Sequence, residues 1–404
     1  MDDASGLIDR SSPTDAREYV IGVMRTMVED GDREGFESLV EQATARFEQR
    51  LIESLRLRVD LFGFDAPHVA PTEGAYAPLD FVRIGLSEKL ERDAHFLLIV
   101  TEVDLSATSV SFALALPSQL TNVGVISTRR LDPSFWGDEP QIETTIERLA
   151  ALMFHTFGHL LNLDHSPDPT NVMYDVAQVA ELDHMTDVTP DQSAEIGRQL
   201  PREARERVSE RGGSQWSFVL GMLARNAGAI ATAVGRANPA RMVGRLPTML
   251  AAALSIVIVL FFSPEMWDVA STVEFYQLLI FACAAVVGST LVLYRAFAFG
   301  TVLRRDRLLS ESGVVTEAAT VVALLLTVAS LYALFAVAIY LGVVTIFPRS
   351  LMETWPTVDP AVRSIDHLKL ALLVSGLGVL AGSLGGRVDG KALVRGVLFL
   401  DEET

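Results

Sequence analysis

The sequence has very few cysteines and lysines, the residues that form disulfide frameworks and contribute to basic surfaces. One cysteine, Cys283, is present among 404 residues and lies in an apolar run, so neither a disulfide framework nor a cysteine-ligated metal site is expected. Lysine is almost as rare, because only Lys89, Lys369 and Lys391 occur and every other basic residue is arginine. The formal net charge of −18 disfavours binding to phosphate backbones, so we expect no nucleic-acid partner.

The negative charge is unevenly distributed along the chain. Residues 1–210 carry 38 acidic against 18 basic side chains, whereas the remainder carries 13 against 15. The first half therefore has the composition of an acidic soluble domain, and the second half is of another kind. An acidic, lysine-poor surface is typical of halophilic proteins, in which carboxylates maintain hydration at high salt. A GC-rich genome explains the same arginine bias, and the sequence leaves both explanations open.

Hydrophobic periodicity divides the first half into helices and strands. Apolar residues at three- and four-residue spacing predict two helices between Asp15 and Leu57, broken at residues 30–32. Residues 58–85 are mixed in character, and proline and glycine mark loops within them. Short β-branched and aromatic runs predict strands of one sheet at 97–101, 109–115 and 123–127. A long helix is expected over 141–163, and another opens after Thr189, the expected N-cap residue.

Three of the seven histidines are concentrated at the end of the 141–163 helix. His155 and His159 are four residues apart and therefore lie on one face of a helix, where both imidazoles can reach a single ion. His165 can join them if the helix stops near Asn162, because asparagine tolerates the left-handed conformation that such a stop requires. Three imidazoles suit zinc and leave a fourth coordination position open.

The run from His155 to His165, followed by Met173, resembles the metzincin metallopeptidases. Their motif is H-E-x-x-H-x-x-G-x-x-H followed by a methionine turn. The resemblance implies that His155, His159 and His165 are zinc ligands and that Met173 forms the methionine turn. The segments 101–104 and 125–136 are similar to the strand and loop that precede this helix in the archaemetzincins. The implied activity is zinc-dependent hydrolysis of peptide bonds.

The sequence departs from the family motif at two positions. Asn162 stands in place of glycine, which is a mild change for the reason given above. Thr156 stands in place of the catalytic glutamate, and a threonine hydroxyl cannot act as a general base near neutral pH. Archaemetzincins also carry cysteines for a second, structural zinc, whereas Ser166 and Asn171 fall in that neighbourhood here. We therefore expect a single zinc ion.

Other polar residues near the motif carry weaker expectations. Asp164 is adjacent to His165 and either replaces the missing base or stabilises the turn by hydrogen bonding, with the structural role favoured. Asp183 and His184 are expected to lie in a solvated loop.

Four apolar segments in the second half have the length needed to cross a bilayer. Arginine-rich loops alternate with loops that have few basic residues, which predicts that both termini and the zinc domain face the cytoplasm. Residues 1–15 are polar and acidic, so no signal peptide is expected. The four predicted spans are 246–262, 276–299, 318–347 and 368–384.

The sequence thus predicts an α/β (α+β) metzincin-like zinc-peptidase domain followed by an all-α transmembrane domain. The expected boundaries are 1–212 for the zinc domain, 213–245 for a linker with an interfacial helix, and 246–404 for a multi-pass domain in the cell membrane. Two functions remain open: a membrane-anchored zinc metallopeptidase that acts on peptides or proteins, and a catalytically impaired zinc-binding pseudo-peptidase with a binding or regulatory role. A membrane transporter or assembly factor with a regulatory soluble cap is disfavoured, because no Asp, Glu or His lies deep inside a predicted span.

Overall fold

A computed structural model shows the chain as two compact units. One comprises residues 1–227, 302–316 and 398–404, and the other comprises residues 228–301 and 317–397. The functional boundaries at 212 and 245 stay predictions. The structure describes residues 19–27, 31–55, 59–66, 78–106, 112–204, 208–210, 215–296, 308–345, 364–385 and 397–398.

The first unit is built on a five-stranded mixed sheet. Its strand order is β2-β1-β3-β5-β4, in which every neighbouring pair is parallel except the antiparallel pair β5-β4. The strands are β1 (Tyr19–Thr26), β2 (Val59–Asp65), β3 (Phe96–Thr101), β4 (Ala115–Ser118) and β5 (Val123–Ser127). The predicted α/β sheet is therefore present.

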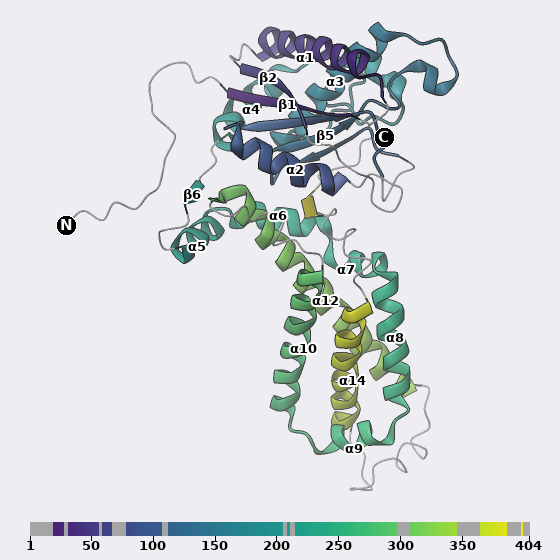
Figure 1. The fold of residues 1–404 in the computed structure, drawn as a ribbon. Helices are drawn as coiled ribbons and strands as arrows, with labels where there is room; N and C mark the ends of the chain where they lie inside the picture. The colour runs from purple at the N-terminus through teal and green to yellow at the C-terminus, as the bar shows by residue number, and fades with distance from the viewer. Residues whose placement is uncertain are drawn as a thin grey trace, which may run out of the picture. The chain divides into compact units, whose positions relative to one another are not determined.

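Helices cover both faces of this sheet. Figure 1 shows α1 (Arg33–Leu55) and α3 (Ile142–Leu160) on one face and α2 (Pro78–Glu91) on the other. Because both faces are covered, the central strand β3 is fully buried. Leu98 belongs to the core on the α3 side, whereas Ile99 lies against Gly85 of α2. The alternation of strand side chains thus supplies two separate apolar layers.

The prediction of two helices between Asp15 and Leu57 is wrong in its first half. Residues 19–26 form β1, the strand between β2 and β3, and only Arg33–Leu55 is helical. The apolar residues of β1 coincide with a helical period, but a parallel strand buried on both faces needs no polar–apolar alternation. The mixed region 58–85, to which the sequence pattern assigns no strand or helix, contains β2 and the start of α2, with Pro78 as the first residue of that helix.

Other predicted elements are confirmed. The strands expected at 97–101 and 123–127 are β3 and β5, and the helix expected over 141–163 is α3. The helix α4 (Pro190–Glu203) begins after Thr189, whose hydroxyl accepts a hydrogen bond from Gln192 N. Of the strand expected at 109–115, residues 109–111 lie outside the described residues, and β4 begins at Ala115.

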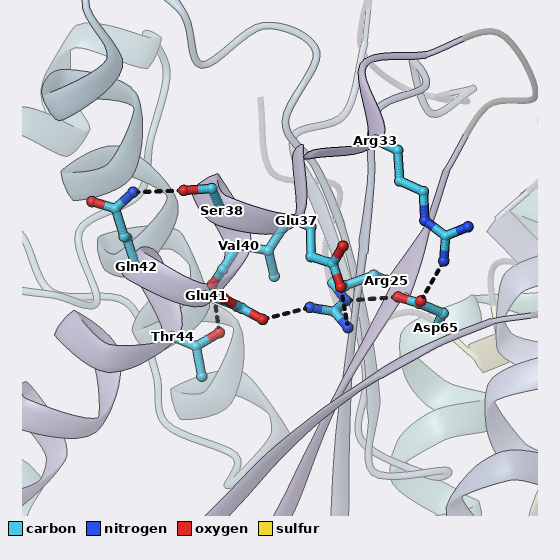
Figure 2. A network of polar contacts seen from close by, with 9 residues as sticks. All are labelled: Arg25, Arg33, Glu37, Ser38, Val40, Glu41, Gln42, Thr44 and Asp65. Atoms are coloured by element: carbon cyan, nitrogen blue, oxygen red, sulfur yellow. Dashed lines mark hydrogen bonds and ion pairs between the residues drawn. The ribbon is translucent and has the colours of Figure 1, made fainter. Parts of the chain in front are cut away.

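Buried charge fastens α1 to the sheet. The Arg25 side chain on β1 contacts Glu37 and Glu41 of α1, each at 3.1 Å, and Asp65 of β2 at 2.8 Å (Figure 2). Arg33, the first residue of α1, adds a second ion pair to Asp65 at 2.9 Å. Three carboxylates around one buried guanidinium compensate for its removal from water, so this network is structural.

The remaining elements are mostly helices. Among the described residues, three helices are long and apolar enough to cross a membrane, namely Phe275–Arg295 in α10, Glu311–Thr345, which is α12, and Asp366–Gly385 in α14. The number of candidate spans rises to five if each of two bent helix pairs counts as one span. The segment expected as the first span forms α8, which a bend of 81° separates from α9. The elements are η1 (Pro133–Trp136), η2 (Val179–His184), β6 (Val208–Glu210), α5 (Gln215–Arg225), α6 (Ala227–Ala237), α7 (Pro239–Met242), η3 (Val243–Arg245), α8 (Pro247–Phe261), α9 (Pro264–Thr272), α10 (Phe275–Ala296), β7 (Leu308–Ser310), α12 (Glu311–Thr345) and α14 (Ser364–Gly385).

Glycines on α14 permit close helix packing in the second unit. A Cβ atom on Gly378 would overlap Val257 of α8, and a Cβ atom on Gly382 would lie 2.7 Å from Ala253 Cβ of the same helix. Small residues four apart allow two helix backbones to approach closely.

Candidate metal centre

The first two histidines of the motif are buried on the last turns of α3. His155 is 0% exposed and His159 is 3% exposed. The Nδ1 atom of His155 lies 2.7 Å from the carbonyl oxygen of Val172. Because a carbonyl only accepts, Nδ1 carries the proton and the Nε2 atom of His155 presents a lone pair. This hydrogen bond fixes both the tautomer and the ring orientation that a metal ligand needs.

Asn162 turns the chain back at the end of α3. Its φ of 60° lies in the left-handed region, as the sequence led us to expect. Asn162 N donates to His159 O at 3.0 Å, and Leu163 N donates to Gly158 O at 3.1 Å. These two bonds form a Schellman motif with asparagine in the place that glycine usually takes. The turn allows His165 to reach the other two histidines.

The three histidine side chains converge through their Nε2 atoms. The Nε2 atom of His159 lies 3.1 Å from that of His155 and 3.0 Å from that of His165. Zinc–nitrogen bonds of about 2.0–2.1 Å in a tetrahedral site would separate ligand nitrogens by roughly 3.4 Å. Within the part of the chain that the structure describes, this triad is the one group of three or more His, Cys, Asp or Glu side chains that could hold a metal ion. Three convergent imidazole nitrogens are a donor set that zinc prefers, so the residues present fit that ion.

Met173 packs against α3 at Gly158. Its side chain is fully buried, and a Cβ atom on Gly158 would overlap the Met173 sulfur. Met173 O accepts a hydrogen bond of 2.7 Å from Ser166 N, next to His165. Gly158 is therefore part of the site because it admits Met173, although nothing in the sequence singled it out.

Thr156 faces the sheet. It is fully buried, its methyl group fills the space beside Gly124 of β5, and its hydroxyl has no hydrogen-bond partner among the described residues. Residue 156 therefore supplies a buried neutral hydroxyl.

Neighbouring polar residues take other roles. Asp183 forms two hydrogen bonds with Arg148 of α3, at 2.6 and 2.9 Å, so it fastens η2 to the helix and is not simply solvated as expected. Asp164 and His184 are exposed. Asp168, in the loop after His165, accepts hydrogen bonds from the backbone and side chain of Thr170, which lower the pKa of its carboxyl. The contacts between Asp168 and Thr170 shape this loop.

Part of the chain is similar in sequence to archaemetzincins. No protein-family model matches the chain. The archaemetzincin of Pyrococcus furiosus is 32% identical over 96 residues, which is 23% of this chain and 50% of that protein. The archaemetzincin of Pyrococcus horikoshii is 26% identical over 136 residues, 34% of this chain and 70% of that protein. At the first of these matches, the chain spans half the length of its relative.

Solved structures give weaker likenesses. The archaemetzincin of Methanopyrus kandleri matches with a TM-score of 0.37 and 22% identity, covering 46% of this chain and 97% of that chain. A zinc-dependent peptidase of Methanocorpusculum labreanum matches with a TM-score of 0.33 and 20% identity, covering 43% and 100%. The chain is thus similar in sequence to archaemetzincins over part of its length, and it contains a histidine triad that could hold a metal ion.

Proposed function

We propose that this chain is a membrane-anchored, zinc-dependent metallopeptidase-like protein in which His155, His159 and His165 bind one zinc ion. The observation that carries the proposal is the convergence of three Nε2 atoms, with His155 oriented by the Val172 carbonyl. Similarity to archaemetzincins supports it. A bound zinc ion would supply a Lewis acid that activates water and polarises a peptide carbonyl. The partner would be a peptide or protein, and no nucleic acid.

A second candidate function rests on Thr156. A buried, neutral hydroxyl cannot take and return a proton during peptide hydrolysis, and loss of a general base typically costs about 10²–10⁴-fold in rate. The alternative is a catalytically impaired zinc-binding pseudo-peptidase that binds a peptide and acts as a regulator at the membrane. Residue 156 bears directly on the choice between the two.

The proposal places the second unit in the cell membrane as a multi-pass domain. Three long apolar helices, and up to five spans with the bent pairs, support this location. The arginine distribution supports a cytoplasmic position for the zinc domain, residues 1–212, ahead of a linker at 213–245 and a membrane domain at 246–404.

Metal content of the full-length protein tests the proposal. The protein would be purified in detergent without added metal, beside His159→Ala and the matched variant His184→Ala, which changes an exposed histidine outside the triad. We expect about one zinc per chain in the wild type and in His184→Ala, and none in His159→Ala. An equal zinc content in all three proteins, or none in any, would remove the zinc proposal. Cleavage of an unfolded protein such as casein then separates the peptidase from the pseudo-peptidase.

A further inference from the structure

The side-chain amides of Asn171 and Gln192 form a hydrogen-bonded pair close in sequence to Met173 and to the start of α4. Asn171 Nδ2 donates to Gln192 Oε1 at 2.8 Å, and Gln192 Nε2 donates back to Asn171 Oδ1 at 3.0 Å. Asn171 is 1% exposed and Gln192 is half-buried, so the Asn171 end of the pair is shielded from water. The pair connects the turn that contains Met173 to the first turn of α4.

Each amide has a second task at its own end. Gln192 Oε1 also accepts a hydrogen bond of 3.0 Å from Thr189 N, as the third residue of a capping box, so its position is fixed by the start of α4. Asn171 Oδ1 also accepts a hydrogen bond of 2.9 Å from Met173 N. The amide pair therefore ties the backbone at Met173 to a helix end that is itself capped.

The turn held in this way contacts two of the three histidine segments. Val172 O accepts from His155 Nδ1 at 2.7 Å, and Met173 O accepts from Ser166 N, next to His165, at 2.7 Å. Hydrogen bonds joined by the backbone of residues 171–173 thus connect α4 to the groups that orient His155 and place His165.

We propose that Asn171 and Gln192 are positioning residues that hold the three histidines in their metal-binding arrangement. This inference rests on the proposed zinc function. Neither residue touches the converging nitrogens, so the effect is indirect: partners outside the ligand set fix ligand geometry, and their loss typically costs about 10–100-fold in metal affinity.

Gln192→Glu is the discriminating variant. A glutamate at this position keeps the acceptor for Thr189 N and suits the start of a helix, so α4 itself should be preserved. It cannot donate to Asn171 Oδ1, so one of the two hydrogen bonds of the pair is lost and a carboxylate oxygen faces that amide oxygen instead. Gln42→Glu makes the same chemical change at an exposed position on α1 and serves as the matched control.

Two measurements on the full-length protein test the inference. The first is hydrogen–deuterium exchange of the metal-free protein over the peptide 163–176, and the second is the rate at which zinc passes to a chelator. In Gln192→Glu we expect exchange in this peptide and zinc release to rise about 10-fold, with an unchanged thermal midpoint. Gln42→Glu should match the wild type in both.

Unchanged exchange over 163–176 together with unchanged zinc release in Gln192→Glu would overturn the inference. If the wild-type protein binds no zinc, the proposed function fails, and exchange alone decides whether the amide pair orders the histidine segment. If Gln192→Glu does not fold, Gln192→Ala replaces it. That variant removes the pair without adding charge, and the same two measurements decide in the same way.

Discussion

Thr156 packs against Gly124 of β5, and a Cβ atom on Gly124 would overlap the methyl group of Thr156. Residue 156 is therefore matched to a glycine on the neighbouring strand. The hydroxyl of Thr156 gains no hydrogen bond among the described residues in return. This pairing makes residue 156 part of the contact between α3 and the sheet. Substitutions at residue 156 also test whether the site catalyses peptide hydrolysis.

Thr156→Glu should increase peptide hydrolysis by about 10²–10⁴-fold, because it restores a general base one residue after His155. The measurement is the rate of casein cleavage per zinc-loaded chain. Thr156→Gln is the matched control, since glutamine has nearly the same size and no basicity. Equal rates in both variants would argue that the site is built for binding and that catalysis is not its task.

Gly158→Ala should destabilise the packing of Met173 against the histidine helix. Alanine favours a helix over glycine by about 1 kcal/mol, but overlap with the Met173 sulfur is expected to cost about 1–3 kcal/mol. We expect a lower thermal midpoint and faster zinc release. Gly197→Ala is the control, because Gly197 lies on α4 with open space around its Cα atom, and it should raise the midpoint slightly. A stabilised Gly158→Ala would show that Met173 moves aside without cost.

The parts of this site that follow from sequence are local ones. His155 and His159 share a face by helical spacing, and Asn162 allows the chain to reverse within three residues. These features depend on neighbours along the chain, so they can be predicted. The contributions of Val172 and Gln192 come from segments 17 and 21 residues away from their partners, and no periodicity encodes them.

The error at β1 has a related cause. Val20, Val23 and Met24 are spaced as on a helix, but the segment lies between two parallel strands, where both of its faces are buried. Burial on both faces removes the alternation that identifies a strand, and only the position of β1 in the sheet distinguishes the two structures.

Glu203 should make stability depend on pH. Burial raises the pKa of its carboxyl above the usual 4.5, nearby Glu311 raises it further, and Arg202 opposes the shift. The folded state therefore binds this proton more tightly than the unfolded chain does. This contribution to stability is complete below the unfolded value and is lost as the pH rises through the higher folded value.

Glu203→Gln should therefore have a higher thermal midpoint than the wild type at neutral pH, and the difference should vanish below pH 4.5. The exposed loop residue Glu139 supplies the control variant Glu139→Gln. The measurement is the thermal midpoint as a function of pH. A constant difference between Glu203→Gln and the wild type across the pH range would contradict this account.

Gly382→Leu should disrupt the second unit without affecting the metal centre. A leucine would have to occupy the space where Gly382 approaches Ala253 Cβ and the Met249 carbonyl oxygen of α8, and overpacking of this kind typically costs about 1–3 kcal/mol. Gly342→Leu on α12 is the control, because nothing lies within 4 Å of the position that its Cβ atom would take. The thermal midpoint in detergent should fall only for Gly382→Leu, while zinc content stays equal in both variants. Loss of zinc from Gly382→Leu would instead show that packing of α14 on α8 is coupled to the histidine site.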